Sequence, residues 1–238
     1  GIHVDGNNSR ITSSGGNVIV KGIAGGIQGY NYGVHLYNGG EITAGSNGTV
    51  NVEGQGGNAA AGNNNFNYGI YVGGNNSRIT SSGGNVTVKG TGGSGPDHLF
   101  NHGVQVRDGG VITAGGNGIV NVEGQGGNTT GGDYNYGIYL YDAQITSSGG
   151  NVIVKGTGGT GKKSNIGVNL ETDGEITAGG NGTVNVEGQG GNATDESNYG
   201  INLRGSITST NGSITVKGTG SNGAADIMID GGLISSTS

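Results

Sequence analysis

The chain has 238 residues, of which 60 are glycine, with one proline, no tryptophan and no cysteine. Only 30% of the residues are hydrophobic, which is too little for an ordinary globular core of this length. The net charge is −6 and the ten basic residues are dispersed, so we expect no nucleic-acid partner and, without cysteine, no disulfides. No apolar run is long enough to cross a membrane, and we expect no membrane span.

A repeat organises the apolar residues along the chain. Tetrapeptides such as "GIHV" open each repeat unit, and successive openings lie 30 to 36 residues apart. A degenerate eighth copy, "DIMI", begins at Asp226. The seven regular units begin at Gly1, Gly33, Gly69, Gly103, Gly137, Gly167 and Gly200.

Each unit contains three short apolar phrases, in a fixed order. The first places apolar residues two apart, the second is a single isoleucine followed by Thr or Ser, and the third is Val-x-Val, as at Val86 and Val88. Spacing by two is typical of strands, and the Gly, Asn and Ser clusters between phrases are typical of turns. The pattern predicts an all-β fold, a parallel β-helix with three short strands per coil of about 33 residues and seven to eight coils.

The length of the repeat varies at one place, between the third phrase and the next unit. We therefore expect a variable loop at one corner of the coil. These loops are residues 23–30, 56–66, 91–100, 126–134, 157–164 and 189–197. A rival parse with two coils of about 16 residues per unit would leave the lone-isoleucine column empty in alternate coils. We favour one coil per unit.

One charged slot after the third phrase alternates in sign through the whole chain. Equivalent residues of stacked coils lie about 4.8 Å apart, so alternation surrounds each charge with opposite charges and penalises a slip by one coil. We interpret this charge ladder as a structural feature that fixes the register of the stacked coils. Lysine-bearing and glutamate-bearing coils alternate along it, so the chain has two coil types. The members of the ladder are Lys21, Glu53, Lys89, Glu123, Lys155, Glu187 and Lys217. A second, imperfect ladder is Arg10, Glu41, Arg78, Val111, Gln144, Glu175 and Ser206.

The sequence offers few candidates for chemistry, and we expect no enzyme activity, no cofactor and no metal site. "GGNGIVNVEG" is similar to a calcium-binding nonapeptide, but Val120 stands where the calcium-ligating aspartate belongs. His3 and His35 share the outward slot of the first strand with residues as different as Gln105 and Asn169, which indicates a surface position. The threonine column that includes Thr80 lacks the second threonine column expected of an ice-binding face.

An aromatic slot precedes most units, in the phrase "NYG". Stacked rings there could stiffen the rod or serve as a carbohydrate platform together with the adjoining loops. We name these residues as candidate surface or ligand contacts. They are Tyr32, Tyr68, His102, Tyr136 and Tyr199, with Ile166 in the same slot.

Phrases such as "GGNVTVKGTGG" and "GEITAGGNGTVNVEGQGG" resemble the repeats of large bacterial surface proteins of the filamentous-haemagglutinin and autotransporter-adhesin kind. The resemblance implies a right-handed parallel β-helix, secretion, and display on the bacterial cell surface as a fibre that mediates attachment. We expect residues 1–238 to be one β-solenoid segment, an excerpt of a longer repetitive protein. Its expected partners are further repeats or copies of itself, end to end, and glycans or cell surfaces. The alternatives are a polysaccharide-binding or polysaccharide-cleaving β-helix protein and an ice-binding solenoid.

Overall fold

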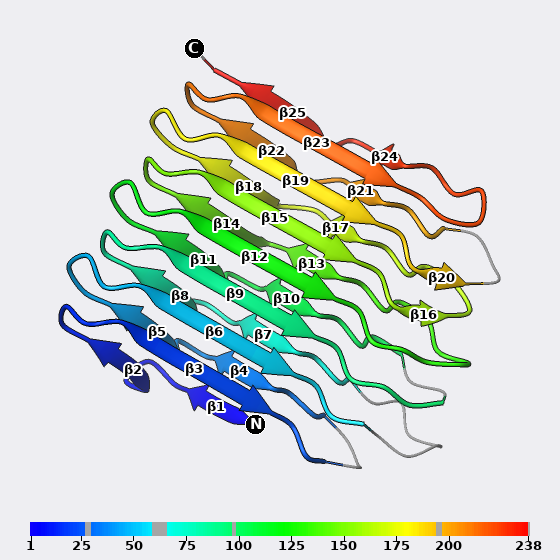
Figure 1. Cartoon of the computed structure of the whole chain (residues 1–238), viewed down its shortest axis with the longest axis horizontal. Coiled ribbons are helices and arrows are strands. Elements are labelled where there is room, and N and C mark those ends of the chain that lie inside the picture. Colours follow the sequence, from blue (N-terminus) through cyan, green and yellow to red (C-terminus); the bar gives the residue numbers. More distant parts are fainter. Residues whose placement is uncertain (27–29, 59–65, 97–98, 194–196, 238) are drawn as a thin grey trace.

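The computed structural model describes residues 1–26, 30–58, 66–96, 99–193 and 197–237. All the regular structure of these residues is β-strand, arranged mainly in three parallel sheets that run side by side along the molecule (Figure 1). Each strand pairs with the equivalent strands of the preceding and following repeat units. The predicted β-solenoid with three strands per coil is therefore confirmed, and the two termini lie at opposite ends of the stack.

The three sheets correspond to the three apolar phrases. Sheet A consists of β1 (Ile2–Asp5), β4 (Val34–Tyr37), β7 (Ile70–Gly73), β10 (Val104–Arg107), β13 (Ile138–Tyr141), β17 (Val168–Leu170), β21 (Ile201–Leu203) and β24 (Ile227–Ile229). Sheet B consists of β2 (Arg10–Ser13), β5 (Glu41–Ala44), β8 (Arg78–Ser81), β11 (Val111–Ala114), β14 (Ala143–Ser147), β18 (Gly174–Ala178), β22 (Ser206–Ser209) and β25 (Leu233–Ser236). Sheet C consists of β3 (Val18–Ile23), β6 (Val50–Gln55), β9 (Val86–Thr91), β12 (Val120–Gln125), β15 (Val152–Thr157), β19 (Val184–Gln189) and β23 (Ile214–Thr219).

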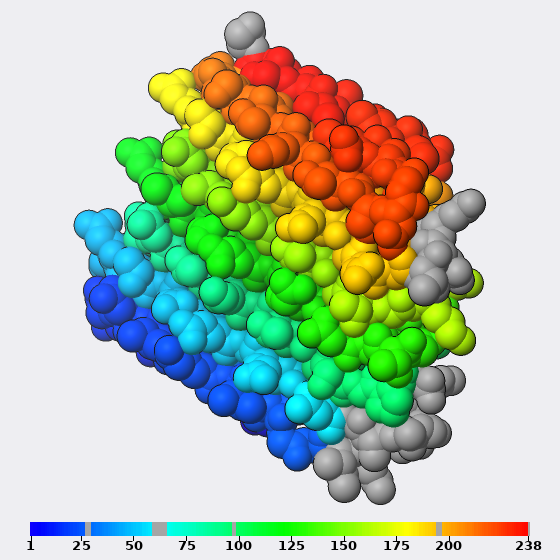
Figure 2. Space-filling view, turned by 45° about the vertical axis from the view of Figure 1, so that its right-hand side comes forward, coloured from blue at the N-terminus to red at the C-terminus, as the bar shows by residue number. Residues whose placement is uncertain are grey.

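The strand register decides between the two parses of the repeat. Ile112 pairs with Ile79 on one side and Ile145 on the other, so the lone isoleucines form one continuous column. The rival parse with two coils per unit predicts that every second coil lacks this isoleucine. It is wrong, because every coil in the described residues contributes one to the column. Figure 2 shows the same order from outside, as successive bands of colour running from the N-terminal to the C-terminal coil.

The core lies inside the coil and repeats with it. In the second coil Val34, Leu36, Ile42, Val50 and Val52 are all at most 1% exposed. Strand alternation turns every second side chain inward, and stacking then places like side chains above one another. Each coil completes its apolar contacts with its neighbours, which makes stability a nearest-neighbour property of the stack.

A glycine follows the charged slot in every coil for a steric reason. Gly124 lies within β12, and its inward position packs against the backbone that leads into sheet A. A Cβ on Gly124 would overlap the carbonyl oxygen of Gly137, and Gly90 meets Gly103 in the same way. The motif "KG" or "EG" therefore marks the corner at which the variable loops leave the coil.

The variable loops continue the stack in part. β16 (Thr160–Gly161) pairs in parallel with β20 (Asn192–Ala193), and Thr129 forms an isolated bridge with Gly95 of the preceding coil. The loops thus add a short ladder that the sequence analysis did not predict. Parts of the predicted loops, residues 27–29, 59–65, 97–98 and 194–196, lie outside the described part of the chain.

Candidate functional site

The charge ladder stands on the outer face of sheet C in the predicted order. Lys89 pairs in register with Glu53 on one side and with Glu123 on the other. Ion pairs join Lys21 to Glu53 at 2.9 Å, and Lys89 to Glu123 at 3.5 Å. Lys155 and Glu187 form the next pair at 3.2 Å. Each of these three lysines therefore pairs with the glutamate of the following coil, a directionality that the sequence did not reveal.

Asparagine helps to orient the glutamates. In the glutamate-bearing coils the strand reads Asn-Val-Glu, and Asn121 Nδ2 donates to Glu123 Oε1 at 3.4 Å while Oε2 faces Lys89. Hydrogen bonds from Lys155 and Asn185, in that order, hold the pKa of Glu187 below its ordinary value. All of these charges are exposed, so each pair contributes little free energy and its value lies in register.

A third charged set lies at the end of sheet A, and the sequence analysis missed it. Arg204 binds Glu171 of the preceding coil at 3.2 Å and Asp230 of the following coil at 3.1 Å. The signal was available, since all three residues directly follow the first apolar phrase of their units. The second ladder, by contrast, forms one of its expected ion pairs, Arg78 with Glu41 at 2.9 Å.

The aromatic slot forms a stacked column, as one of its two predicted roles requires. Ring centroids are 5.3 Å apart for Tyr32 and Tyr68, 5.1 Å for Tyr68 and His102, and 4.7 Å for His102 and Tyr136. The expectation of surface exposure is wrong for three members, because Tyr68, His102 and Tyr136 are 5%, 2% and 8% exposed. Tyr32 and Tyr199 are half-buried.

A second aromatic column covers the first and explains its burial. Tyr30, Phe66, Phe100 and Tyr134 stack along the axis with centroids 5.1 to 5.3 Å apart. Phe100 meets His102 edge-on at 6.0 Å, and Tyr134 meets Tyr136 at 6.2 Å. This layer belongs to the ends of the variable loops, and each of its rings stands two residues before the aromatic slot in four successive units, so the signal was present in the sequence.

His102 is a strongly perturbed titratable group of this corner. It lies between two parallel tyrosine rings, and its Nδ1 accepts a hydrogen bond from the backbone N–H of Tyr136 at 3.2 Å. Burial and, secondarily, the charge of Arg107 lower its pKa to about 3. The imidazole is therefore neutral at physiological pH and acts as one more ring of the stack.

The outward slot of sheet A is also more buried than expected. Gln105 and Asn169 are 2% and 1% exposed, so the inference that varied residues mark a surface slot is wrong there. The aromatic corner packs over this slot, as in the contacts of Tyr139 with His102 and Tyr136 at 5.5 and 5.7 Å. His3 remains exposed, and burial lowers the pKa of His35 to about 4.

An asparagine ladder beneath the aromatic column is the main feature that sequence reasoning missed. Asn67 Nδ2 donates to Asn101 Oδ1 at 2.9 Å, and Asn101 Nδ2 donates to Asn135 Oδ1 at 2.8 Å. All members are buried, and buried amides must be hydrogen-bonded to avoid a large desolvation cost. The signal was the asparagine that precedes every aromatic slot. Side-chain amides bond to one another from Asn31 to Asn135. Farther along the column, Asn165 and Asn198 accept hydrogen bonds from backbone N–H groups of the preceding unit, and Asn165 Nδ2 has no partner among the described residues. The column comprises Asn31, Asn67, Asn101, Asn135, Asn165 and Asn198.

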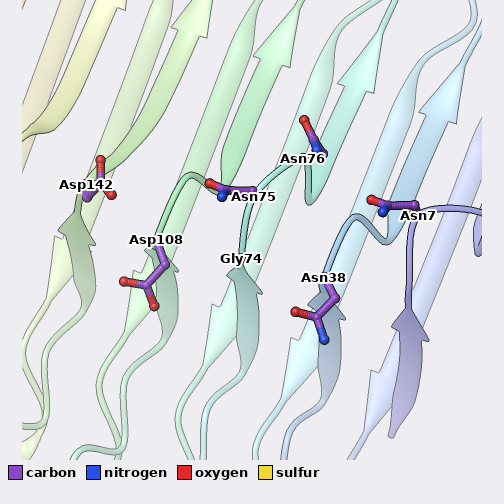
Figure 3. A pocket seen from close by; sticks show the side chains of 7 residues that line it. All are labelled: Asn7, Asn38, Gly74, Asn75, Asn76, Asp108 and Asp142. Carbon is purple, nitrogen blue, oxygen red and sulfur yellow. The ribbon is translucent and has the colours of Figure 1, made fainter.

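A shallow groove of about 510 Å³ runs across several coils where sheet A turns toward sheet B. Figure 3 shows Asn38, Gly74, Asp108 and Asp142 in a row at the ends of their strands. Asn38, Asp108 and Asp142 have φ values of 49°, 53° and 45°, a left-handed conformation that Asn and Asp tolerate. Tyr37 and Tyr141 directly precede two of these residues and are 38% and 39% exposed. The remaining lining residues are Asn7, Asn75 and Asn76.

No group of three or more His, Asp or Glu side chains in the described ranges is placed to hold a metal ion. The described residues also include no helix long and apolar enough to span a bilayer. Comparison with family models, curated proteins and solved structures finds no match to the chain. The function must therefore be argued from the solenoid and its surfaces.

Proposed function

We propose that the chain is a structural repeat segment of an extracellular bacterial surface fibre or adhesin stalk. The observation that supports this role is the unbroken register of all three sheets, from the first coil to the last. Because each coil contacts its neighbours alone, a solenoid can lengthen without changing its cross-section, and eight coils make a rod of roughly 35–40 Å. The bacterial and extracellular parts of the proposal rest on the resemblance of the repeats.

Attachment is the second part of this role. The variable loops leave the rod at one corner, where they can differ without disturbing the three sheets. End-to-end association belongs to the same proposal, because the terminal strands of each sheet have one unpaired edge.

Electron microscopy with labelled antibodies against the chain tests this proposal. We expect label along filaments at the surface of the producing cells, and a β-rich circular dichroism spectrum for the isolated chain. Label confined to the cell interior, or to compact particles, would contradict the proposed role.

Polysaccharide binding is a second candidate, favoured by the groove in Figure 3. Its side-chain amides and carboxylates offer both donors and acceptors to hydroxyl groups, and the partly exposed Tyr37 and Tyr141 directly precede the lining residues Asn38 and Asp142 in the chain. Affinity electrophoresis against neutral polysaccharides tests it. Retardation should be lost in Tyr141→Ala and retained in Thr113→Ala, a control on the outer face of sheet B; no retardation of the unmodified chain would dismiss this candidate.

A further inference from the structure

The outer face of sheet C carries an ordered pattern of charge over seven strands. Its strands all pair over six residues, and each strand presents three outward side chains. Glutamate coils present Asn-Glu-Gln, as in Asn121, Glu123 and Gln125. Lysine coils present a β-branched residue, Lys and again a β-branched residue, as in Thr87, Lys89 and Thr91.

This pattern limits how two such faces can meet. If two copies faced each other with equivalent coils opposed, every lysine would meet a lysine and every glutamate a glutamate. If a two-fold axis parallel to the strands passed midway between two coils, every glutamate coil would face a lysine coil. Closed two-fold dimers are the commonest assemblies of identical chains, so this arrangement is also favoured by symmetry.

We propose that sheet C is the contact face of a lateral, antiparallel dimer of this chain, in which Glu123 of one copy faces Lys155 of the other. The same operation sets Lys89 opposite Glu187 and Glu53 opposite Lys217. Each of these three contacts occurs twice because of the symmetry. The proposal extends the fibre role from a single rod to a pair of rods, and it depends on the fold rather than on the cellular location.

One observation selects this register over the neighbouring one, in which Glu123 would face Lys89. The neighbouring register would set Ile19 and Ile23, which are 67% and 70% exposed, opposite the side-chain amides of Asn185 and Gln189.

The flanking columns fit the same arrangement. Gln125 faces Thr157, and Thr91 faces Gln189, so side-chain amides meet hydroxyl groups that can both donate and accept. Shallow grooves of about 210 to 330 Å³ run beside the ladder and leave room for bridging water. Among the opposed residues that flank the ladder, one pair is unfavourable, because the amide of Asn121 faces the apolar side chain of Ile153.

The size of the face is sufficient for a specific but weak contact. Six opposed coils at about 4.8 Å per coil, with six residues at about 3.3 Å each, give roughly 600 Å² per chain. The total is close to the roughly 1,000 Å² at which specific interfaces begin. Because the contact is charge-rich, we expect it to weaken as salt rises.

Charge exchange tests the proposal through the dimer dissociation constant, measured by sedimentation equilibrium at low salt. Glu123→Lys sets like charges together twice, so dimerisation should weaken by about tenfold or more. Adding Lys155→Glu restores both contacts and should restore dimerisation. Adding Lys89→Glu instead gives the same composition and the same number of like neighbours within the chain, but it leaves the like-charge contact with Lys155 in place and sets a second carboxylate opposite Glu187, so dimerisation should not recover.

The outcomes separate cleanly. Rescue by Lys155→Glu and not by Lys89→Glu supports the proposed dimer. Rescue by neither variant, rescue by Lys89→Glu instead, or a wild-type chain that remains monomeric overturns it. Circular dichroism of each variant establishes that the solenoid is intact. Failure of the dimer would leave the fibre proposal standing, because filament labelling on cells tests that separately.

Discussion

The outer face of sheet C and the aromatic corner beside sheet A are built by opposite strategies. On sheet C unlike charges alternate in solvent, and the same chemistry recurs every second coil over the whole sheet. At the corner like rings stack under a second layer, and the aromatic column gives way to Ile166 after Tyr136. On sheet C, where water screens the charges, stacking equivalent residues contributes little stability and mainly favours one strand register. At the corner, where the loops exclude water, stacking buries apolar surface and contributes stability.

The largest expected effect comes from emptying the buried corner. Tyr136→Ala removes a ring that is 8% exposed and stacks on His102 and Tyr139. Loss of a buried aromatic side chain costs about 3–5 kcal/mol. Tyr141→Ala, at a ring 39% exposed, should cost less than about 1 kcal/mol. Urea unfolding of the two variants measures the difference; equal losses would mean that the corner is not a second core.

The asparagine ladder should rank next. Asn101→Ala removes the side chain between Asn67 and Asn135 and leaves their buried amide groups with fewer partners. We expect a loss of about 2–4 kcal/mol in the free energy of unfolding. Asn121→Ala on sheet C is the matched control and should change stability by about 0.5 kcal/mol or less. A similar loss at both sites would show that the ladder has no special role.

Acid should destabilise the folded chain in part through this buried corner. His102 has its pKa lowered to about 3 in the folded chain, against about 6.5 when unfolded, so the unfolded state binds the proton more tightly. The stabilisation is complete above pH 6.5 and is lost as pH falls from 6.5 toward 3, by up to about 1.4 kcal/mol per pH unit.

His102→Tyr tests this dependence, because tyrosine already occupies the same slot in both neighbouring coils. Unfolding free energies at a series of pH values should fall less steeply for the variant than for the wild type. The pH dependence that remains in the variant should include a contribution from His35, whose pKa is lowered to about 4. Identical slopes for both chains would show that His102 is not buried in the folded state.

The smallest expected effect belongs to the exposed ladder within one chain. Glu123→Lys places three lysines in succession and should cost about 1 kcal/mol or less at low salt, measured below the concentration at which copies associate. The cost should nearly vanish in 1 M salt, where screening acts within about 3 Å. Glu123→Gln separates lost attraction from added repulsion. A salt-independent loss would instead indicate a packing role for Glu123.

The sequence predicted the coil well because the coil is local and periodic. The pairing of Ile112 with Ile79 and of Lys89 with Glu123 followed from three local signals. These are apolar residues two apart, turn residues between the phrases, and a nearly fixed interval from the second phrase to the third. The corner was predicted less well. Tyr68 and Tyr136 stood in a regular column with an aromatic residue two positions before each, but this spacing did not indicate whether the earlier rings would cover the column.

By itself the sequence determined the three-sheet solenoid, its register and the order of its charges, because each depends on spacing along the chain and on neighbours one coil away. The tertiary structure alone decided which side chains lose contact with water. Phe100 and Tyr134 stand two residues before His102 and Tyr136, and burial depends on their packing edge-on against these rings, which the spacing alone does not determine. The direction of lysine pairing toward the following coil, seen at Lys21, Lys89 and Lys155, is likewise a matter of side-chain geometry.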